Sequence, residues 1–374
     1  MQILRIDSRS PYQALVGVGG IGSGCFFALE GNHTLGRNES RPGHLLDVRD
    51  YCKLHIITHY VATLLGAGRK EQGFRVLPIG LVGDDAAGRQ VVEEMAQAGI
   101  DTRLVLILAG KPTLFSVCFQ YPDGSGGNMT TSNSAAALLR EPHVDAAAPL
   151  LGSAGKRVMV LAAPEVPLGV RRYLLELATR AGAFRLASFV SAEIADARQC
   201  GMFGLLDLVS LNESEAGELV GETYSPDNAE VFLEKCQQVL RSSWPNLQMV
   251  VSAGAEGAYA VSGEMWSYRP APKVQAASTA GAGDALLGGI IAAMAAGAPL
   301  LKARGPGHAL PSRELETALD LGVLLASYKC QSPHTIHPDA CLATLIDFAR
   351  SRGLSFAPGL QSRFSENPAL KPMV

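Results

Sequence analysis

The stretch that decides the fold is Ala277-Ser278-Thr279-Ala280-Gly281-Ala282-Gly283-Asp284, which leads directly into a small and apolar run from Ala285 to Ala296. The run ends at Gly297-Ala298-Pro299, a combination that stops a helix. Because the run is apolar on every side, we expect a helix that is buried in a sizeable core.

The glycines of this stretch leave successive backbone N–H groups free at a helix N-terminus, where the macrodipole contributes about half a positive charge. Anions bind at such places, and phosphate is the usual one. Asp284 then has two interpretations. It caps the helix, or it is a carboxylate beside an anion hole that takes the proton from a hydroxyl attacking a phosphoryl group.

Composition limits the classes of protein to consider. The 374 residues suffice for one large α/β domain or two ordinary ones, and 47% hydrophobic with 18% charged residues is typical of a globular protein. A net charge of −3 gives no basic stripe for nucleic acid. The seven cysteines are odd in number and widely spaced, which favours reduced thiols. Without a signal-peptide core or an apolar run long enough to span a membrane, we expect a cytoplasmic protein.

Strand and helix patterns alternate along most of the chain. This alternation predicts a largely parallel sheet covered on both faces. The expected strands are 14–18, 74–81, 104–108, 114–120, 157–161, 184–187, 206–211 and 248–252, with a hairpin within 257–268. The expected helices are 54–65, 88–98, 168–180, 192–199, 213–219, 227–240, 313–329 and 338–350, with a loop at 125–137 and a loose or surface-packed tail after 353.

Three polar stretches follow expected strands and should therefore share one edge of the sheet, since ligands of open α/β sheets bind beyond the carboxyl ends of the strands. They are Asn212 with Glu215, the segment from Ser252 to Gly257, and the turn from Gly281 to Asp284. An amide and a carboxylate suit a hydrated magnesium ion, although Asn212 and Glu215 could equally cap a helix. Glycines at 254 and 257 let the backbone approach a ribose or phosphates.

The N-terminal part offers further interpretations. Gly17-Val18-Gly19-Gly20-Ile21-Gly22 fits the dinucleotide fingerprint G-x-G-x-x-G, but residues 23–30 leave room for at most two helical turns and no βαβ unit follows. The polar segment 31–53 is a solvated insertion or a lid over a polar ligand. His55 and His59 are four residues apart and lack a third ligand for a metal site.

At these residues the sequence resembles the ribokinase-like (PfkB) carbohydrate kinase family. Four motifs in family order carry the resemblance: Gly80 to Gly88, Asn212 to Glu215, Ser252 to Gly257, and Thr279 to Asp284. It implies an α/β protein with a three-layer α/β/α fold, a mostly parallel central sheet and a small β lid. The lid would use segments of about 24–53 and 103–130 within a single domain 1–353, which is followed by a tail 354–374.

The resemblance also implies roles for particular residues. Asp284 would be the catalytic base, and Gly281, Ala282 and Gly283 would form the anion hole. Glu215 and Asn212 would support Mg²⁺ through water. The residues implied in ATP binding are Asn212, Ser252, Gly254, Gly257 and Thr279.

The sequence departs from the family in its acceptor half. Ser278 stands where the family usually has Asp, which leaves a neighbouring monovalent-cation site open to doubt. Residues 19–24 lack the carboxylate that usually binds sugar hydroxyls, and residues 52–57 replace the family's Gly-Gly-x-x-x-Asn segment. The candidate acceptor-binding residues are His33, Arg37, Lys53 and His55, which could bind an acidic or phosphorylated acceptor or be surface charges.

The sequence thus favours an ATP-dependent phosphotransferase acting on a hydroxymethyl group of a sugar, a sugar derivative or a nucleoside. The lid offers a surface for a homodimer, and neither nucleic acid nor membrane is an expected partner. Two alternatives stay open at this point. One is a nucleotide- or sugar-binding protein that has lost turnover on the same fold, and the other is a dinucleotide-dependent oxidoreductase that uses Gly17 to Gly22.

Overall fold

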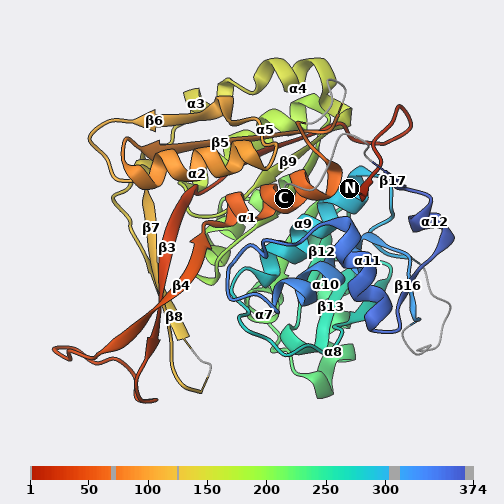
Figure 1. The fold of residues 1–374 in the computed structure, drawn as a ribbon. Helices are drawn as coiled ribbons and strands as arrows, with labels where there is room; N and C mark the ends of the chain where they lie inside the picture. The colour runs from red at the N-terminus through yellow and green to blue at the C-terminus, as the bar shows by residue number, and fades with distance from the viewer. Residues whose placement is uncertain (1, 69–72, 124–125, 303–311, 367–374) are drawn as a thin grey trace.

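A nine-stranded sheet forms the centre of the molecule in the computed structural model, which describes residues 2–68, 73–123, 126–302 and 312–366 (Figure 1). The strand order is β14-β13-β12-β11-β10-β9-β2-β5-β6, and the six strand pairs from β12 to β6 are all parallel. Only the β12-β13 and β13-β14 pairs of this sheet are antiparallel. The strands of this sheet are β2 Ala14–Val18, β5 Arg75–Gly83, β6 Val105–Leu108, β9 Val158–Ala162, β10 Phe184–Ser188, β11 Leu208–Asn212, β12 Gln248–Ser252, β13 Gly257–Val261 and β14 Trp266–Pro270.

Helices cover both faces of this sheet, and each helical layer packs into its own hydrophobic core. One layer consists of α1 Lys53–Leu65, α2 Ala86–Gln97, α9 Ala282–Ala295, α10 Ala318–Lys329 and α11 Leu342–Ser351. The other consists of α3 Glu141–Asp145, α4 Ala148–Ala154, α5 Leu168–Ala181, α6 Ile194–Gln199, α7 Glu213–Val220 and α8 Ala229–Ser243. The predicted three-layer α/β/α fold is confirmed.

The apolar helix α9 is buried along its whole length except at its first two residues, as its composition predicts. Its glycines permit close helix packing. A Cβ on Gly289 would lie 2.9 Å from the Cα of Gly322 in α10, and a Cβ on Gly288 would lie 3.0 Å from the side chain of Tyr60 in α1. The small-residue run therefore fixes how α1 and α10 approach the start of α9, where Asp284 lies.

Four strands form a separate sheet that projects from the main body (Figure 1). They are β3 Gly22–Leu29, β4 Gly43–Tyr51, β7 Leu114–Gln120 and β8 Gly126–Thr130, in the order β4-β3-β7-β8. We call this the lid sheet. It corrects one expectation, because part of the expected loop 125–137 is strand β8, and it fills residues 22–29, which leave little room for a helix, with strand β3. β3 pairs with β7, which is distant in sequence, whereas β8 pairs with β7, the strand directly before it; in both cases the pairing decides the local structure.

The C-terminal part is more ordered than its composition suggests. Helix α10 begins at Ala318, with Thr317 as its N-cap, and residues expected to open it form the short strand β15 Glu314–Leu315. The predicted tail contains β16 Ser355–Phe356, α12 Pro358–Gln361 and β17 Phe364–Glu366, and β17 pairs with β1 Gln2–Leu4. Residues 367–374 of that tail lie outside the described residues, and the domain division at 353 stays a prediction.

All seven cysteines are free thiols. Among the described residues, none of the helices has the length and apolar character needed to cross a membrane.

Candidate active site

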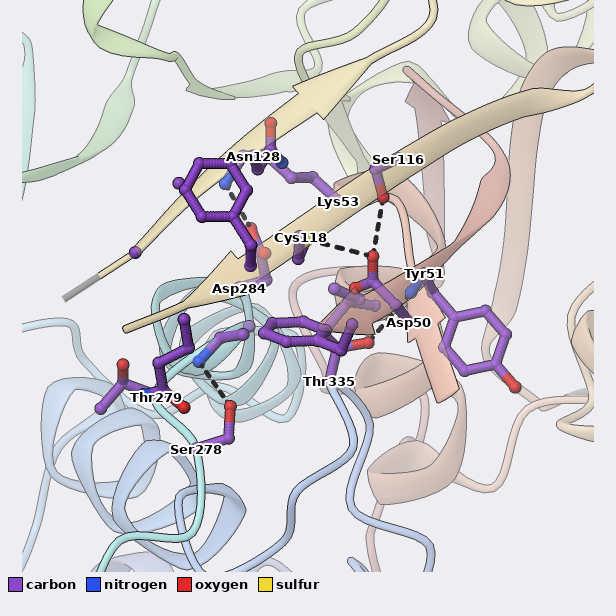
Figure 2. A pocket seen from close by; sticks show the side chains of 18 of the residues that line it. Asp50, Tyr51, Lys53, Ser116, Cys118, Asn128, Ser278, Thr279, Asp284 and Thr335 are labelled. Carbon is purple, nitrogen blue, oxygen red and sulfur yellow. Dashed lines mark hydrogen bonds and ion pairs between the residues drawn. The ribbon is translucent and has the colours of Figure 1, made fainter. Parts of the chain in front are cut away.

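A pocket of about 410 Å³ lies between the lid sheet and the turn that precedes α9 (Figure 2). Its polar lining residues come from β4, the start of α1, β7, β8, the loop after β9, the turn before α9, the first turn of α9, and the segment after α10. They are Asp50, Tyr51, Lys53, Ser116, Cys118, Gln120, Asn128, Glu165, Ser278, Thr279, Asp284 and Thr335. The pocket thus brings together the predicted anion turn, the predicted base and one of the four candidate acceptor-binding residues, Lys53.

The turn before α9 has the geometry of an anion-binding site. Gly281 is the N-cap in the left-handed conformation, with φ 78°, and a Cβ at this position would lie 2.7 Å from the carbonyl oxygen of Thr335. No side chain of the described residues caps this helix end. A Cβ on Gly283 would meet nothing within 4 Å, so the backbone there is open to a ligand. The Ala282 N–H donates a hydrogen bond of 3.0 Å to the Thr279 carbonyl oxygen, so the next N–H groups of α9, at Gly283 and Asp284, are the ones left without a helical partner.

Asp284 lies one residue further along α9 and forms an ion pair with Lys53, whose Nζ is 3.7 Å from the Asp284 Oδ1. The Asp284 side chain is 9% exposed. Burial raises the pKa of its carboxyl group, and the positive charge of Lys53 acts in the opposite direction. The pKa of Lys53 is itself raised, chiefly by Asp284. A partly desolvated carboxylate with a raised pKa is a stronger base than an exposed one.

Glu165, which follows β9, is a second carboxyl group of the pocket. Its backbone has φ 73°, a strained conformation for a residue other than glycine. Its Oε2 accepts a hydrogen bond of 3.1 Å from the backbone N–H of Lys53. Burial raises the pKa of Glu165 to about 7. A Cβ on Gly20 would lie 2.5 Å from the Glu165 Oε2, so the glycine makes room for this carboxyl group.

Asp50, on the lid strand β4, is a third carboxyl group of the pocket and is 6% exposed. Its Oδ2 accepts a hydrogen bond of 2.7 Å from the Ser116 hydroxyl and lies 3.6 Å from the Cys118 Sγ (Figure 2). Burial raises the pKa of Asp50. A Cβ on Gly24 would overlap the Asp50 carboxylate. Gly20 and Gly24 lie in the segment 19–24, which has no acidic residue. Carboxyl groups from other elements, Glu165 and Asp50, pack against these two glycines instead.

Asn212 and Glu215 form a reciprocal capping box at the start of α7. The Asn212 Oδ1 accepts a hydrogen bond of 2.8 Å from the Glu215 N–H, and the Glu215 Oε2 accepts one of 2.9 Å from the Asn212 N–H. Burial raises the pKa of Glu215, and the charge of Lys53 opposes this. The capping interpretation is therefore correct, and it engages the single side-chain oxygen of Asn212 but only one of the two carboxylate oxygens of Glu215. The other Glu215 oxygen suits a hydrated magnesium ion, which needs few protein ligands.

The remaining predicted nucleotide residues cluster at the same edge of the central sheet. Ser252 pairs directly with Asn212 across β11 and β12. Gly254, with φ 53°, opens a short 3₁₀ turn, and a Cβ on Gly257, with φ 118°, would overlap the carbonyl oxygen of Arg269. Thr279 is exposed and lines the pocket.

Three of the candidate acceptor-binding residues do not reach the pocket. His33 and Arg37 lie in the exposed segment between β3 and β4, where the His33 Nε2 is 2.9 Å from the Glu39 Oε1. His55 is 1% exposed and packs beside Tyr51, with ring centroids 4.5 Å apart. Burial lowers the pKa of His55 to about 3. Within the described residues, no group of three or more His, Cys, Asp or Glu side chains is arranged to hold a metal ion.

The dinucleotide interpretation also lacks its structural context. The fingerprint requires a helix directly after the glycines, whereas Gly22 opens the lid strand β3. The glycines instead give room to side chains from other elements, as described for Gly20.

Comparisons with known proteins establish the family and the fold. Residues 66–341, more than half of the chain, match the model of the pfkB family of carbohydrate kinases. Many solved structures share the fold, including two ribokinases and a nucleoside kinase. Ribokinase from Cryptococcus neoformans var. grubii serotype A, in complex with ADP, has a TM-score of 0.70 and 20% identity, and the match covers 90% of this chain and 99% of that one.

Ribokinase from Arabidopsis thaliana, complexed with ribose and ATP, has a TM-score of 0.63 and 17% identity, with 94% of this chain and 98% of that one covered. Burkholderia thailandensis nucleoside kinase, in complex with inosine, has a TM-score of 0.65 and 16% identity, with 91% and 98% covered. The fold and the family match define a kinase of the carbohydrate kinase class. The chain belongs to the pfkB family of carbohydrate kinases, as the sequence motifs predict.

Proposed function

We propose that this protein transfers the γ-phosphate of ATP to a hydroxymethyl group of a sugar, a sugar derivative or a nucleoside. The observation that carries the proposal is the position of Asp284. Its buried carboxylate lies in the first turn of α9, beside the open backbone of Gly283 and inside a pocket that also contains Lys53 and Glu165. A base, an anion hole and a polar acceptor pocket thus adjoin one another.

In the proposed reaction Asp284 accepts the proton of the acceptor hydroxyl as that oxygen attacks the γ-phosphorus. The N–H groups of Gly281 and Gly283 donate hydrogen bonds to the phosphoryl oxygens, on which negative charge is distributed, and Ala282 between them shapes the turn through its N–H bond to the Thr279 carbonyl oxygen. Lys53 favours the ionised form of Asp284 before the proton transfer and offers a positive charge next to the transferred group. The bond from the γ-phosphorus to the bridging oxygen breaks, and ADP leaves with the electron pair.

Glu215 and Asn212 are the residues that we propose to hold Mg²⁺, through water molecules. Bound there with the nucleotide, Mg²⁺ supplies positive charge that offsets the charge of the phosphates. Ser252, Gly254, Gly257 and Thr279 are proposed to contact the nucleotide, because they lie at the same sheet edge or in the pocket.

The acceptor is proposed to be a neutral polyol such as a sugar or nucleoside. Asp50, Glu165 and Asn128 line the acceptor side of the pocket and can form hydrogen bonds with hydroxyl groups. Two carboxyl groups make this side unfavourable for a phosphorylated or acidic acceptor. A neutral acceptor replaces the acidic or phosphorylated acceptor for which His33, Arg37 and His55 were considered. The ribose and inosine in the complexes of the ribokinase and nucleoside kinase neighbours support a polyol acceptor.

The test is an ADP-release assay with ATP, Mg²⁺ and a panel of sugars, sugar phosphates and nucleosides. We expect stimulation by at least one unphosphorylated polyol and little by sugar phosphates, with the product identified by mass spectrometry. ATP binding without transfer to any member of a broad panel would favour a binding protein that has lost turnover. Absence of ATP binding would reject the proposal.

The outer face of the lid sheet supports a proposed homodimer. Leu45, Phe115 and Met129 are 65%, 38% and 62% exposed. The strand register places them on the face opposite Asp50 and Ser116. Light scattering on the wild type and on the Leu45→Lys variant tests this, and a monomeric wild type would reject it.

A further inference from the structure

Lys329 is a fully buried lysine next to the catalytic turn, and the proposed reaction gives it no role. It is the last residue of α10 and is 0% exposed. Its Nζ donates a hydrogen bond of 3.0 Å to the carbonyl oxygen of Ser278. Burying an ammonium group is unfavourable unless nearby charges or dipoles compensate for it, so the position calls for an explanation.

The end of α10 also holds the turn through its backbone. The carbonyl oxygen of Cys330 accepts hydrogen bonds from the N–H groups of Ala277, at 2.7 Å, and of Ser278, at 3.3 Å. Lys329 therefore adds a positive charge to a segment that already positions the turn. Asp284 and Asp50 are the acidic groups whose charge acts on this ammonium.

The residues beside the turn do not fit a free monovalent cation. Such an ion needs several oxygen ligands, and Ser278 supplies no carboxylate at this place. The Ser278 hydroxyl accepts a hydrogen bond of 3.2 Å from the Ala280 N–H, and its carbonyl oxygen already accepts one from Lys329. A second positive charge at this place would also be repelled by the ammonium of Lys329.

We propose that the ammonium of Lys329 acts as a tethered cation, which replaces a free monovalent ion beside the anion-binding turn and makes the kinase independent of K⁺ and Na⁺. The inference rests on the proposed function, since it concerns the same turn. Lys329 touches neither the nucleotide nor the acceptor in this account. It is a positioning residue that fixes the turn from Ser278 to Gly281 and adds positive potential near the phosphate site.

The charge of Lys329 should be lost within an accessible pH range. Burial lowers its pKa to about 8, while Cys330, Asp284 and Asp50 act to raise it. His337, on the segment after α10, also faces Lys329, whose charge contributes to lowering the pKa of His337. Since the tethered cation is present below a pH of about 8 and disappears above it, wild-type turnover should decline through that range.

The first experiment compares wild-type turnover in tetramethylammonium chloride, NaCl and KCl at equal ionic strength. We expect equal rates in the three salts. Marked activation by K⁺ or Na⁺ would overturn the proposal, and this arm requires no variant. If no acceptor is phosphorylated, the affinity for ATP and Mg²⁺ is measured by calorimetry in the same salts. Equal affinities support the tethered cation and K⁺-dependent affinity overturns it, whatever the fate of the proposed transfer.

The second experiment removes the charge. Lys329→Met should lower kcat about tenfold or more, as expected when electrostatic support of an anion hole is lost. The decline of turnover near pH 8, expected for the wild type, should be absent in Lys329→Met. Lys329→Ala should show the same loss of rate or ATP affinity, and added K⁺, ammonium or methylammonium should restore part of it. The loss of a purely structural lysine would not be restored by such cations. Exposed Lys273→Met is the matched control.

Melting temperatures identify any variant that fails to fold. A folded Lys329→Met variant with the wild-type rate and pH profile would refute the role of the ammonium.

Discussion

The Asp284 carboxylate and the Lys53 ammonium lie 3.7 Å apart, one in the first turn of α9 and the other at the first position of α1. These two helices pack closely at Gly288, where a Cβ would lie 3.0 Å from the Tyr60 side chain. A partly buried carboxylate would otherwise retain its proton more readily, because burial disfavours the charged form. Lys53 thus favours the ionised form of the proposed base.

Replacing Lys53 with Met should shift the pH dependence of kcat. Since Lys53 acts to lower the pKa of Asp284, its removal should raise that pKa further. The base must be deprotonated to act, so the rise in kcat with pH should move to higher pH. A pH–rate profile measures this shift, and Lys53→Arg is the control that retains the charge. An unchanged profile in Lys53→Met would separate Lys53 from the ionisation of Asp284.

Glu165→Gln should stabilise the protein at neutral and alkaline pH. Burial raises the pKa of Glu165 from 4.5 to about 7, so the folded state binds more protons than the unfolded state between these values. Wild-type stability therefore contains a contribution that falls as pH rises from 4.5 to about 7 and stays low above it. Glu165→Gln has no ionisable group at this position, so its free energy of unfolding does not fall in this way as the pH rises.

Above that range Glu165→Gln should gain about 1–3 kcal/mol in the free energy of unfolding, since each pKa unit corresponds to ~1.4 kcal/mol. Denaturant unfolding at acidic and alkaline pH checks this, with exposed Glu218→Gln as the control. Glu165→Gln should also raise the KM for the acceptor. A variant less stable than the wild type at alkaline pH would contradict the assignment.

Two glycines of the turn should respond differently to Ala. Gly281→Ala places a side chain at φ 78° and 2.7 Å from the Thr335 carbonyl oxygen, so it should lower stability by about 1–3 kcal/mol. Gly283→Ala meets nothing within 4 Å and should fold normally, but its methyl group enters the proposed phosphate site. We expect it to impair kcat or ATP affinity at an unchanged melting temperature. Similar stability losses in both variants would argue against the open backbone at Gly283.

Asp50→Asn should weaken acceptor binding without changing the KM for ATP. The Asp50 carboxylate is buried on the lid sheet and accepts a hydrogen bond from Ser116, so it can bind an acceptor hydroxyl more strongly than an amide can. We expect the acceptor KM to rise about tenfold, as when a charged hydrogen bond worth ~1.5 kcal/mol is lost. Asp47→Asn, at an exposed position of the same strand, is the control. Equal effects of the two substitutions would remove Asp50 from the acceptor site.

The phosphate side of the site could be predicted from the sequence, because its local structures are encoded within short segments. The apolar run after Asp284, the glycines that precede it and the Asn212–Glu215 capping box are each encoded within a few residues, so their local structures could be predicted. The alternation of strands and helices was sufficient for the central sheet and its layers.

The acceptor half depends on contacts between distant segments. Glu165 packs against Gly20 and Asp50 packs against Gly24, and no spacing in the sequence predicts these contacts. Glu165 could have been found, because it follows β9 at the same sheet edge as Asn212. Asn128 could not, since the glycines of β8 indicate a loop and only pairing with β7 makes it a strand. His55 was misjudged because its helix periodicity does not reveal which face is buried.

The most direct test of the account is a comparison of wild type and Asp284→Asn with the best acceptor of the panel. We predict that kcat falls by about 10²-fold or more, in line with the contribution of a general base, while the Kd for ATP is nearly unchanged. Unchanged turnover in Asp284→Asn would contradict the central claim that this carboxylate is the catalytic base.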